Sequence, residues 1–356
     1  WSIARELMGY RKLVYKKLMF SLARQPYIDT RLSFNSFLPN NLKTKIGKKL
    51  VSFWIDKLKN KPFLHDKIES EIAITCFSFD FIKKLSGSPL NKKEKTIFHK
   101  VSKKMFIEYF NEKNPGSISF NLNKLKNLEN KQFNYNLNKI NINEIINDCI
   151  QYGCIPFSIF ARHAFIAMSI LNSLEKMKIL SKTDKDNFLG SIRTISTNII
   201  EDNNKLLKKK ITKYSFLKKY GHLRPGTYDI SSKSYNELNY FNKNLNPNKK
   251  KKIDKFKLNN QILIKIDKLL KKENINISSL ELFDYLEKSI SLREYSKFIF
   301  TKNVSILLNK IVLDGKKIRL NRENLSYLDI KDCLNLKSNK LKKYKKIIKE
   351  NKLKNM

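Results

Sequence analysis

Residues 154–171 read CIPFSIFARHAFIAMSIL, the most apolar stretch of the chain, and this stretch indicates the fold class. It is apolar nearly all round a helix, so it predicts a buried central helix over about 155–180. Arg162 and His163 interrupt it, and ionisable side chains are costly in a bilayer, which favours a core helix over a membrane span. Gly and Pro number nine and eight in 356 residues, and such scarcity predicts a mainly α protein.

Helical spacing of apolar residues recurs on both sides of this stretch. A short extended segment is expected near 27–37, where the period changes from helical to alternating. Two Asn/Lys-rich segments, 112–142 and 242–257, are expected to be long loops. Further helices are predicted over about 1–25, 40–58, 65–85, 91–111, 183–210, 278–292, 293–315 and after 321.

These patterns divide the chain into three parts. Residues 1–220 are expected to form a helical domain with an insertion at about 112–142. Residues 221–335 are expected to form a loop and a C-terminal helical subdomain, and residues 336–356 a Lys-rich tail. Because the chain begins at Trp1, within what looks like a structural element, it is expected to be a segment of a longer protein.

The formal net charge of +41 raises the question of nucleic-acid binding. Of the 73 basic residues, 63 are Lys and ten are Arg. Proteins that read nucleic acids rely on Arg, because its planar fork matches phosphates and guanine edges. Lys, Asn and Ile share A/T-rich codons, so compositional drift explains the excess, and nucleic acid is not the expected partner. Positions that keep Arg become candidates for bidentate contacts.

Cysteine usage and the absence of sequence motifs narrow the functional classes. The four cysteines form no CxxC pair and have no metal-ligand spacing with the four His, so reduced thiols in a cytoplasmic protein are expected, without a metal site. No signal peptide is visible, and no membrane association is expected. GxGxxG, GxxxxGK[ST], GxSxG and HExxH are all absent, and no complete catalytic set can be assembled.

Two polar clusters offer anion-binding chemistry. In the extended segment, Asp29, Arg31 and Asn35 are expected on one face, where Arg31 could grip an anionic oxygen and the others could orient a hydroxyl. The alternative is an edge strand with a solvated face. Arg293 and Lys297 are one helical turn apart and could hold a phosphate or an acidic partner, although a solvated helix face is the simpler interpretation.

A third cluster lies on the central helix, where Ser158, Arg162, Ser169 and Asn172 form a narrow polar stripe. A buried Arg must be paired, since an isolated buried charge is too costly. A structural partner on a neighbouring helix is favoured over a ligand for Arg162. His163 is expected to be a satisfied core histidine.

Residues 220–230, YGHLRPGTYDI, concentrate residue types that are rare elsewhere in the chain. Pro225 and Gly226 suit the middle of a type II turn, in which Gly accepts a positive φ. Taken alone, the segment is a corner between helices whose polar residues cap neighbouring helix ends. The turn would place two pairs of side chains on opposite sides, His222 with Arg224, and Tyr228 with Asp229.

Four stretches together resemble the central region of phosphoenolpyruvate synthase-like and pyruvate phosphate dikinase-like phosphotransferases, a family that includes rifampicin phosphotransferase. They follow the family's order within residues 1–335. The antibiotic-modifying members tend to have Arg-Gly where this chain has Leu223-Arg224, so the resemblance does not imply rifampicin as the acceptor. The stretches are PYIDTRLSFNSFLP (26–39), PFSIFARHAFIAMSILNSL (156–174), FLKKYGHLRPGTYDISSKSY (216–235) and REYSKFIFTKNVSILLNKI (293–311).

The resemblance implies a chain that supplies only the middle of a larger enzyme. Members of the family join an ATP-grasp nucleotide domain and a swivelling domain with a phosphorylated histidine to this central region. Neither a Gly-rich nucleotide-binding stretch nor a phosphohistidine motif occurs here. ATP and Mg²⁺ are therefore expected to bind the parent enzyme outside this segment. The expected partners are the two missing domains, in the same polypeptide or gene neighbourhood, and a small-molecule phosphoryl acceptor; alone, the chain is expected to be inactive.

By resemblance and polar clustering, ten residues are expected to contact the acceptor or its phosphate. The arginines would bind anionic oxygens, and His222 and Asp229 would position or deprotonate an acceptor hydroxyl. The family interpretation also predicts that residues 220–230 lie near residues 27–31. The alternatives are a basic helical module that binds RNA or another polyanion, and a purely structural linker. The ten residues are Asp29, Arg31, Asn35, Arg162, His222, Arg224, Tyr228, Asp229, Arg293 and Lys297.

Overall fold

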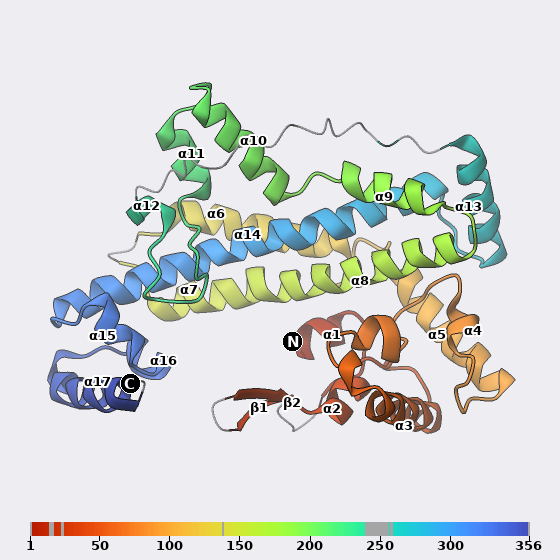
Figure 1. The fold of residues 1–356 in the computed structure, drawn as a ribbon, viewed down its shortest axis with the longest axis horizontal. Coiled ribbons are helices and arrows are strands. Elements are labelled where there is room, and N and C mark those ends of the chain that lie inside the picture. The colour runs from red at the N-terminus through yellow and green to blue at the C-terminus, as the bar shows by residue number, and fades with distance from the viewer. Residues whose placement is uncertain are drawn as a thin grey trace. The chain divides into compact units, whose positions relative to one another are not determined.

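The structure is a computed structural model that describes residues 2–13, 18–22, 25–136, 139–238, 256 and 259–354. It confirms a mainly α protein, and the described residues add one two-stranded antiparallel sheet (Figure 1). The elements are α1 (Ser2–Leu7), β1 (Met19–Leu22), β2 (Gln25–Ile28), α2 (Thr30–Asn35), α3 (Thr44–Asn60), α4 (Phe81–Lys84), α5 (Lys92–Glu108), α6 (Ile118–Asn134), α7 (Ile142–Asp148), α8 (Ile155–Lys176), α9 (Lys182–Ser191), α10 (Ile195–Leu207), α11 (Lys213–Tyr220), α12 (Tyr235–Leu238), α13 (Asn260–Lys272), α14 (Ser279–Lys317), α15 (Arg322–Ser326), α16 (Ile330–Cys333) and α17 (Leu341–Lys354).

The chain forms two compact units, each assembled from three separate segments. Unit 1 contains Trp1–Asn123, Ile155–Ile192 and Ile253–Arg293, and unit 2 contains Lys124–Cys154, Arg193–Lys252 and Glu294–Met356. The expected division at 220/221 does not coincide with either unit, because the units alternate along the sequence.

Unit 1 is organised by the predicted central helix, which is α8. Thirteen of its residues are buried, and α1 packs against it. Helix α7, a π-helical segment at Cys149–Cys154 and α8 follow one another without a break over Ile142–Lys176. This helical stretch is long and apolar enough to cross a membrane, but 61% of its most apolar 18 residues are buried inside the protein. That degree of burial is typical of a core helix and is consistent with a soluble protein. A second part of the unit 1 core forms where α2 and α3 pack around Trp54.

The N-terminal region departs from the predicted pattern. The helix expected over 1–25 ends at Leu7, and Gly9 then adopts a φ of +84°, a left-handed conformation that terminates helices. Extended structure is limited to the hairpin β1–β2, in which Phe20 pairs with Tyr27. The second half of the expected extended segment is helix α2, because the Asp29 carboxylate accepts a hydrogen bond from Leu32 N (2.8 Å) and caps it.

Two further segments of unit 1 and unit 2 were predicted incorrectly. The expected loop over 112–142 contains helix α6, in which the polar residues Asn121 and Gln132 occupy buried positions and interrupt the apolar pattern. The expected helix over 65–85 is a single π-turn, Ile68–Ile72, and the short α4. Three β-branched residues, Ile72, Ile74 and Thr75, occur where the π-turn ends, and they disfavour a continuing helix. The loop expected over 242–257 lies outside the described residues, apart from Phe256.

Helix boundaries in the second half also differ from expectation. The helix predicted over 183–210 is divided into α9 and α10, and α9 begins with a capping box formed by Ser181 and Asp184. The helices predicted over 278–292 and 293–315 are one helix, α14, because no Gly or Pro interrupts the sequence between them. Gly315 lies within α14, and Arg319, with a φ of 59°, follows its end.

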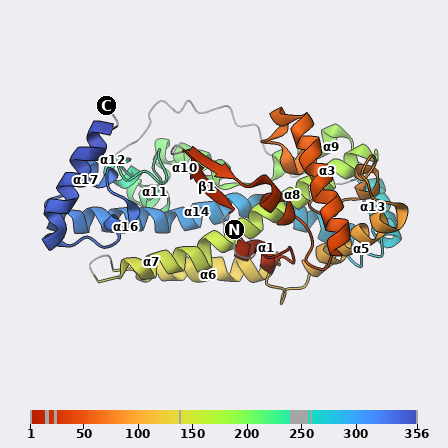
Figure 2. The same cartoon turned by 90° about the horizontal axis from the view of Figure 1, so that it is seen from below.

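Unit 2 contains a core formed by the C-terminal part of α14 with α15, α16 and α17. These three helices gather beside the end of α14 in Figure 1, and α16 and α17 lie there again in the second view (Figure 2). Tyr344 and Ile348 of α17 are buried in this core. The Lys-rich tail expected at 336–356 is therefore an integral part of unit 2.

Candidate functional site

The segment with the unusual composition forms a closed loop in unit 2, between α11 and α12. We call residues 221–234 the Arg224 loop. Helix α11 is capped by Thr212, whose hydroxyl accepts from Ser215 N (3.1 Å), and ends at Tyr220. The base of the loop is closed by backbone hydrogen bonds from Tyr235 N to Leu223 O (2.8 Å) and from Asn236 N to Gly221 O (3.0 Å).

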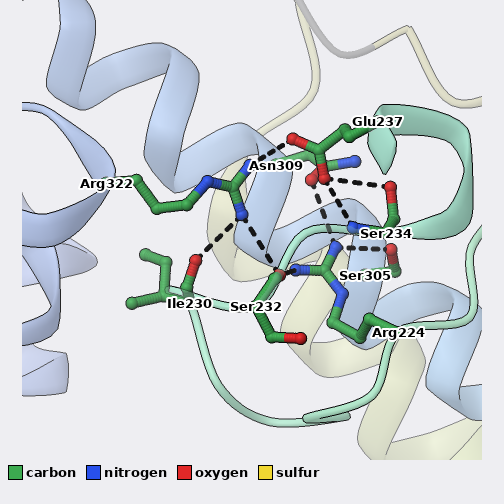
Figure 3. A network of polar contacts seen from close by, with 8 residues as sticks. All are labelled: Arg224, Ile230, Ser232, Ser234, Glu237, Ser305, Asn309 and Arg322. Carbon is green, nitrogen blue, oxygen red and sulfur yellow. Dashed lines mark hydrogen bonds and ion pairs between the residues drawn. The ribbon is translucent and has the colours of Figure 1, made fainter. Parts of the chain in front are cut away.

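Arg224 is buried, with 6% of its surface exposed, and it joins the loop to α14. Its Nη1 donates to the Ser232 carbonyl (2.9 Å), on the opposite side of the loop. Its Nη2 donates to Ser305 Oγ (2.8 Å) and to Asn309 Oδ1 (3.2 Å), both on α14 (Figure 3). The planar guanidinium is needed for this arrangement, because one side chain addresses three acceptors in different directions.

A second arginine holds the same loop from the other side. Arg322, at the start of α15, donates through Nη1 to the carbonyls of Ile230 (2.8 Å) and Ser232 (3.4 Å), and it forms an ion pair with Glu237. The Glu237 carboxylate also accepts from the backbone N (2.8 Å) and the hydroxyl (2.9 Å) of Ser234. Figure 3 shows the two guanidinium groups converging on Ser232 from α15 and from the loop itself. The loop is therefore fixed by charge-assisted hydrogen bonds.

The predicted type II turn at Pro225–Gly226 is wrong. Gly9 and Gly87 are the glycines with positive φ in the described chain, and Gly226 is not among them. Gly226 is needed for space: an added Cβ would lie 2.9 Å from Asp229 Cβ. Two successive turns follow, closed by bonds from Asp229 N to Gly226 O (3.1 Å) and from Ser232 N to Asp229 O (3.2 Å).

The other predicted residues of the loop differ in what they can do. Asp229 accepts from Ser231 N (2.8 Å) and Ser231 Oγ (2.7 Å), and these bonds lower its pKa, so it is an ionised turn carboxylate. Tyr228 is 66% exposed. His222 Nε2 lies 3.2 Å from the Phe298 carbonyl oxygen, and burial lowers the pKa of His222 to about 4. A neutral imidazole is therefore present at neutral pH.

An open pocket of about 430 Å³ lies beside the Arg224 loop in unit 2. It is bounded by α11, the loop, the start of α12 and α14. Two lysine ammonium groups face it, together with histidine, serine and asparagine side chains and an apolar wall, and no carboxylate of the described residues lines it. The lining residues are Tyr214, Leu217, Lys218, His222, Ser234, Asn236, Lys302, Ser305, Ile306 and Asn309.

In unit 1, the polar row around Arg31 is part of a short helix and does not form a strand face. The Asp29 carboxylate caps the N-terminus of α2, and Asn35 Nδ2 donates to the Arg31 carbonyl (2.9 Å) in the same helix. Arg31 itself is exposed. The three side chains therefore act locally, and the expected shared binding face is not formed.

Arg162 has the structural partners that its burial requires. Nε donates to the Tyr10 hydroxyl (2.9 Å), Nη2 donates to the Thr75 carbonyl (2.7 Å), and Nη1 forms an ion pair with Glu69. The interpretation of Arg162 as a core pair is confirmed. Elsewhere in the polar stripe, Ser169 Oγ accepts from Lys84 Nζ (3.0 Å).

His163 is a satisfied core histidine, as predicted. Its Nε2 lies 2.8 Å from the Gly116 carbonyl oxygen and its Nδ1 lies 2.9 Å from the Tyr285 hydroxyl. The carbonyl can only accept, so Nε2 carries the proton and Nδ1 accepts from Tyr285. The ring is also edge-on to Tyr109, with centroids 5.0 Å apart.

The remaining predicted residues, Arg293 and Lys297, are both exposed on α14. Residues 27–31 belong to unit 1 and residues 220–230 to unit 2, so their expected proximity stays a prediction. In the part of the chain that the structure describes, no group of three or more His, Cys, Asp or Glu could hold a metal ion.

Sequence reasoning missed the residues of α14 and α15 that complete this site. Lys302, Ser305 and Asn309 follow one another at spacings of three and four, the same helical periodicity that marked the polar stripe of α8. That signal was available in REYSKFIFTKNVSILLNKI. Arg322 carried a weaker signal, as one of only ten arginines. Comparison of the chain with protein-family models, with curated proteins and with solved structures finds no match.

Proposed function

We propose that this chain is the central, acceptor-side segment of an ATP-dependent phosphotransferase of the phosphoenolpyruvate synthase type. The observation that carries the proposal is that the four stretches resembling this family meet in pairs. In unit 2, Arg224 of residues 216–235 bonds to Ser305 and Asn309 of residues 293–311.

The corresponding pair in unit 1 involves the other two stretches. The Arg162 guanidinium, in residues 156–174, lies over the Phe37 ring, in residues 26–39, at 5.8 Å from its centroid. Contacting residues more than 80 positions apart in sequence thus lie in segments that also carry the resemblance, as expected for a shared fold. This supports common ancestry better than four isolated motif matches would.

In the proposed enzyme, ATP and Mg²⁺ act in an ATP-grasp domain, and a histidine of a swivelling domain carries the phosphoryl group. This chain would bind and orient the acceptor. None of its buried histidines suits the carrier role: Nδ1 and Nε2 of His163 are both hydrogen-bonded, and His222 Nε2 faces a carbonyl. The cationic pocket beside the Arg224 loop offers a place for an acceptor, because no carboxylate among the described residues lines it.

A structural linker between two catalytic domains is the second candidate, and a specific observation favours it. Arg162, Asp29 and Asn35 all serve the fold through core pairing, capping or local hydrogen bonds. If the chain is only a linker, substitutions in the Arg224 loop should not change phosphoryl transfer to the acceptor. The two candidates therefore differ in what a change in that loop does to the reaction.

The first test is the DNA on both sides of this reading frame. An ATP-grasp sequence upstream and a phosphohistidine motif downstream are expected, and an intact gene with neither would overturn the proposal. The second test uses the complete enzyme and measures acceptor-dependent consumption of ATP. Arg224→Ala and the milder Arg224→Lys are expected to reduce it, whereas Arg193→Ala, which removes an exposed ion pair with Glu201, is expected to leave it near wild type. Unchanged consumption in both Arg224 variants would favour the linker.

A further inference from the structure

We propose that the pocket beside the Arg224 loop binds a phosphate monoester of a small molecule. The inference concerns binding by this chain and needs no activity. Only the ligand's role, as phosphoryl acceptor or phosphorylated product, rests on the proposed function.

Two ammonium groups give the pocket a positive potential. Lys218 of α11 and Lys302 of α14 both line it, and neither forms an ion pair with a carboxylate of the described residues. Most of the other buried or half-buried lysines in unit 2 do have such partners; Lys310, for example, pairs with Asp314 (3.0 Å). A pocket with unpaired cations and no lining carboxylate attracts anions.

Lys302 is the stronger candidate of the two, because it is half-buried. Burial lowers its pKa, and the carboxylate that opposes this effect, Glu129, already accepts from the Tyr295 hydroxyl (2.7 Å). The ammonium lies over the exposed Phe133 ring, 5.0 Å from its centroid. An anion in the pocket would supply the counter-charge that a partly desolvated cation lacks.

The neutral donors are turned toward a ligand by Arg224. Because Arg224 Nη2 donates to Asn309 Oδ1 (3.2 Å), the amide oxygen is fixed, and the two N–H groups of Asn309 point away from the guanidinium. Ser305 Oγ also accepts from Nη2 (2.8 Å), so its own hydrogen remains available to donate. Arg224 is thus a positioning residue that presets two donors in the pocket lining.

Together the lining offers two ammonium groups, a hydroxyl and an amide, all of which can donate. A phosphate monoester presents three strongly accepting oxygens and up to two negative charges, which matches this set. The volume of about 430 Å³ exceeds what a bare phosphate fills, and Tyr214, Leu217 and Ile306 provide a less polar wall for the remainder of the ligand. The match favours a phosphorylated small molecule over free phosphate.

The test is isothermal titration calorimetry on the full chain with glucose 6-phosphate, glucose, inorganic phosphate and a single-stranded RNA oligonucleotide as probes. Glucose 6-phosphate is expected to bind, inorganic phosphate to bind more weakly, and glucose not to bind. Lys302→Met is expected to weaken glucose 6-phosphate binding about tenfold or more, as for loss of a charge-assisted contact. Lys316→Met, which removes an exposed lysine from the same helix, is the matched control and should bind as wild type does.

Two results would overturn the proposal. One is the absence of glucose 6-phosphate binding to the wild-type chain at about 10 mM ligand. The other is tight RNA binding that displaces the ester and is weakened equally by Lys302→Met and Lys316→Met, which would indicate a diffuse polyanion surface. Lys218→Met, at an exposed position, provides a second variant if Lys302→Met fails to fold. If the ester binds but the complete enzyme transfers no phosphoryl group, the binding site stands and the proposed function is refuted.

Discussion

Lowering the pH from 7 to 5 is expected to destabilise unit 1 through His163. This histidine is fully buried and neutral, and burial, with the nearby Arg162 charge, lowers its pKa to about 4 from an ordinary value of 6.5. The unfolded chain therefore takes up a proton near pH 6.5, whereas the folded chain does so near pH 4. Stability from the neutral imidazole is complete above pH 6.5 and is lost as the pH falls toward 4.

The magnitude follows from these two values. Between pH 7 and pH 5, linkage gives a loss of about 2 kcal/mol from His163 alone, rising toward about 3 kcal/mol at pH 4. Urea unfolding followed by tryptophan fluorescence measures it, because Trp54 is 1% exposed in the unit 1 core. The other tryptophan, Trp1, should be replaced by Phe so that Trp54 is the sole probe.

His163→Gln is the decisive variant. Gln can keep the donor to the Gly116 carbonyl but not the acceptor for Tyr285, so a cost of about 1–3 kcal/mol at pH 7 is expected. The loss between pH 7 and pH 5 should shrink by most of the His163 contribution, leaving the slope from His99 and, where unit 2 unfolds together with unit 1, from His222, because burial lowers the pKa of both. An equal loss in the variant and the wild type would refute the buried neutral imidazole as its cause.

Three further outcomes are expected. Glu69→Gln removes the counter-charge of buried Arg162 and should cost about 3–5 kcal/mol in urea unfolding, whereas a cost near zero would mean that the ion pair is not needed. Gly153→Ala places a Cβ 2.6 Å from Phe300 Cβ and should lower stability by about 1–3 kcal/mol, seen as a lower melting temperature. Burial raises the pKa of Asp202, but hydrogen bonds from two lysines and a tyrosine lower it by more, so that the pKa falls to about 2. Its stabilising effect should be present above pH 3.8 and be lost toward pH 2, and Asp202→Asn should remove that acid-dependent step from a circular dichroism titration.

The elements predicted well from the sequence are those whose apolar residues alone define one face. Helices α3, α5 and α8 are of this kind, and α8 also gave the fold class. Helix α6 was missed because Asn121 and Gln132 are buried through specific hydrogen bonds, such as Gln132 Nε2 to Asn303 Oδ1 (2.6 Å). Burial of a polar side chain depends on a partner distant in sequence, which a local period cannot reveal.

Only part of the site was predicted, because the rest of it also depends on contacts between residues distant in sequence. The scarcity of arginine correctly singled out Arg224 and Arg162 as residues with demanding geometry, although Arg162 serves the core. The type II turn was wrong because Pro-Gly is compatible with several turns, and the two arginines that hold the loop select a different one. Lys302 could not be recognised from composition in a chain with 63 lysines, since its distinguishing feature is its place in a pocket that no carboxylate of the described residues lines.

The alternation of the two units along the chain constrains how the protein can be made. The chain crosses between the units five times, because each is built from three segments separated by parts of the other. On a ribosome, unit 1 lacks its last segment until residue 293 has emerged, and unit 2 waits for the helices after α14. Cutting the gene at any single position therefore removes part of at least one unit, and α8, although synthesised early, must wait for later segments to bury it. This chain connectivity is expected to make folding during synthesis dependent on chaperones, and to make refolding slow and strongly cooperative.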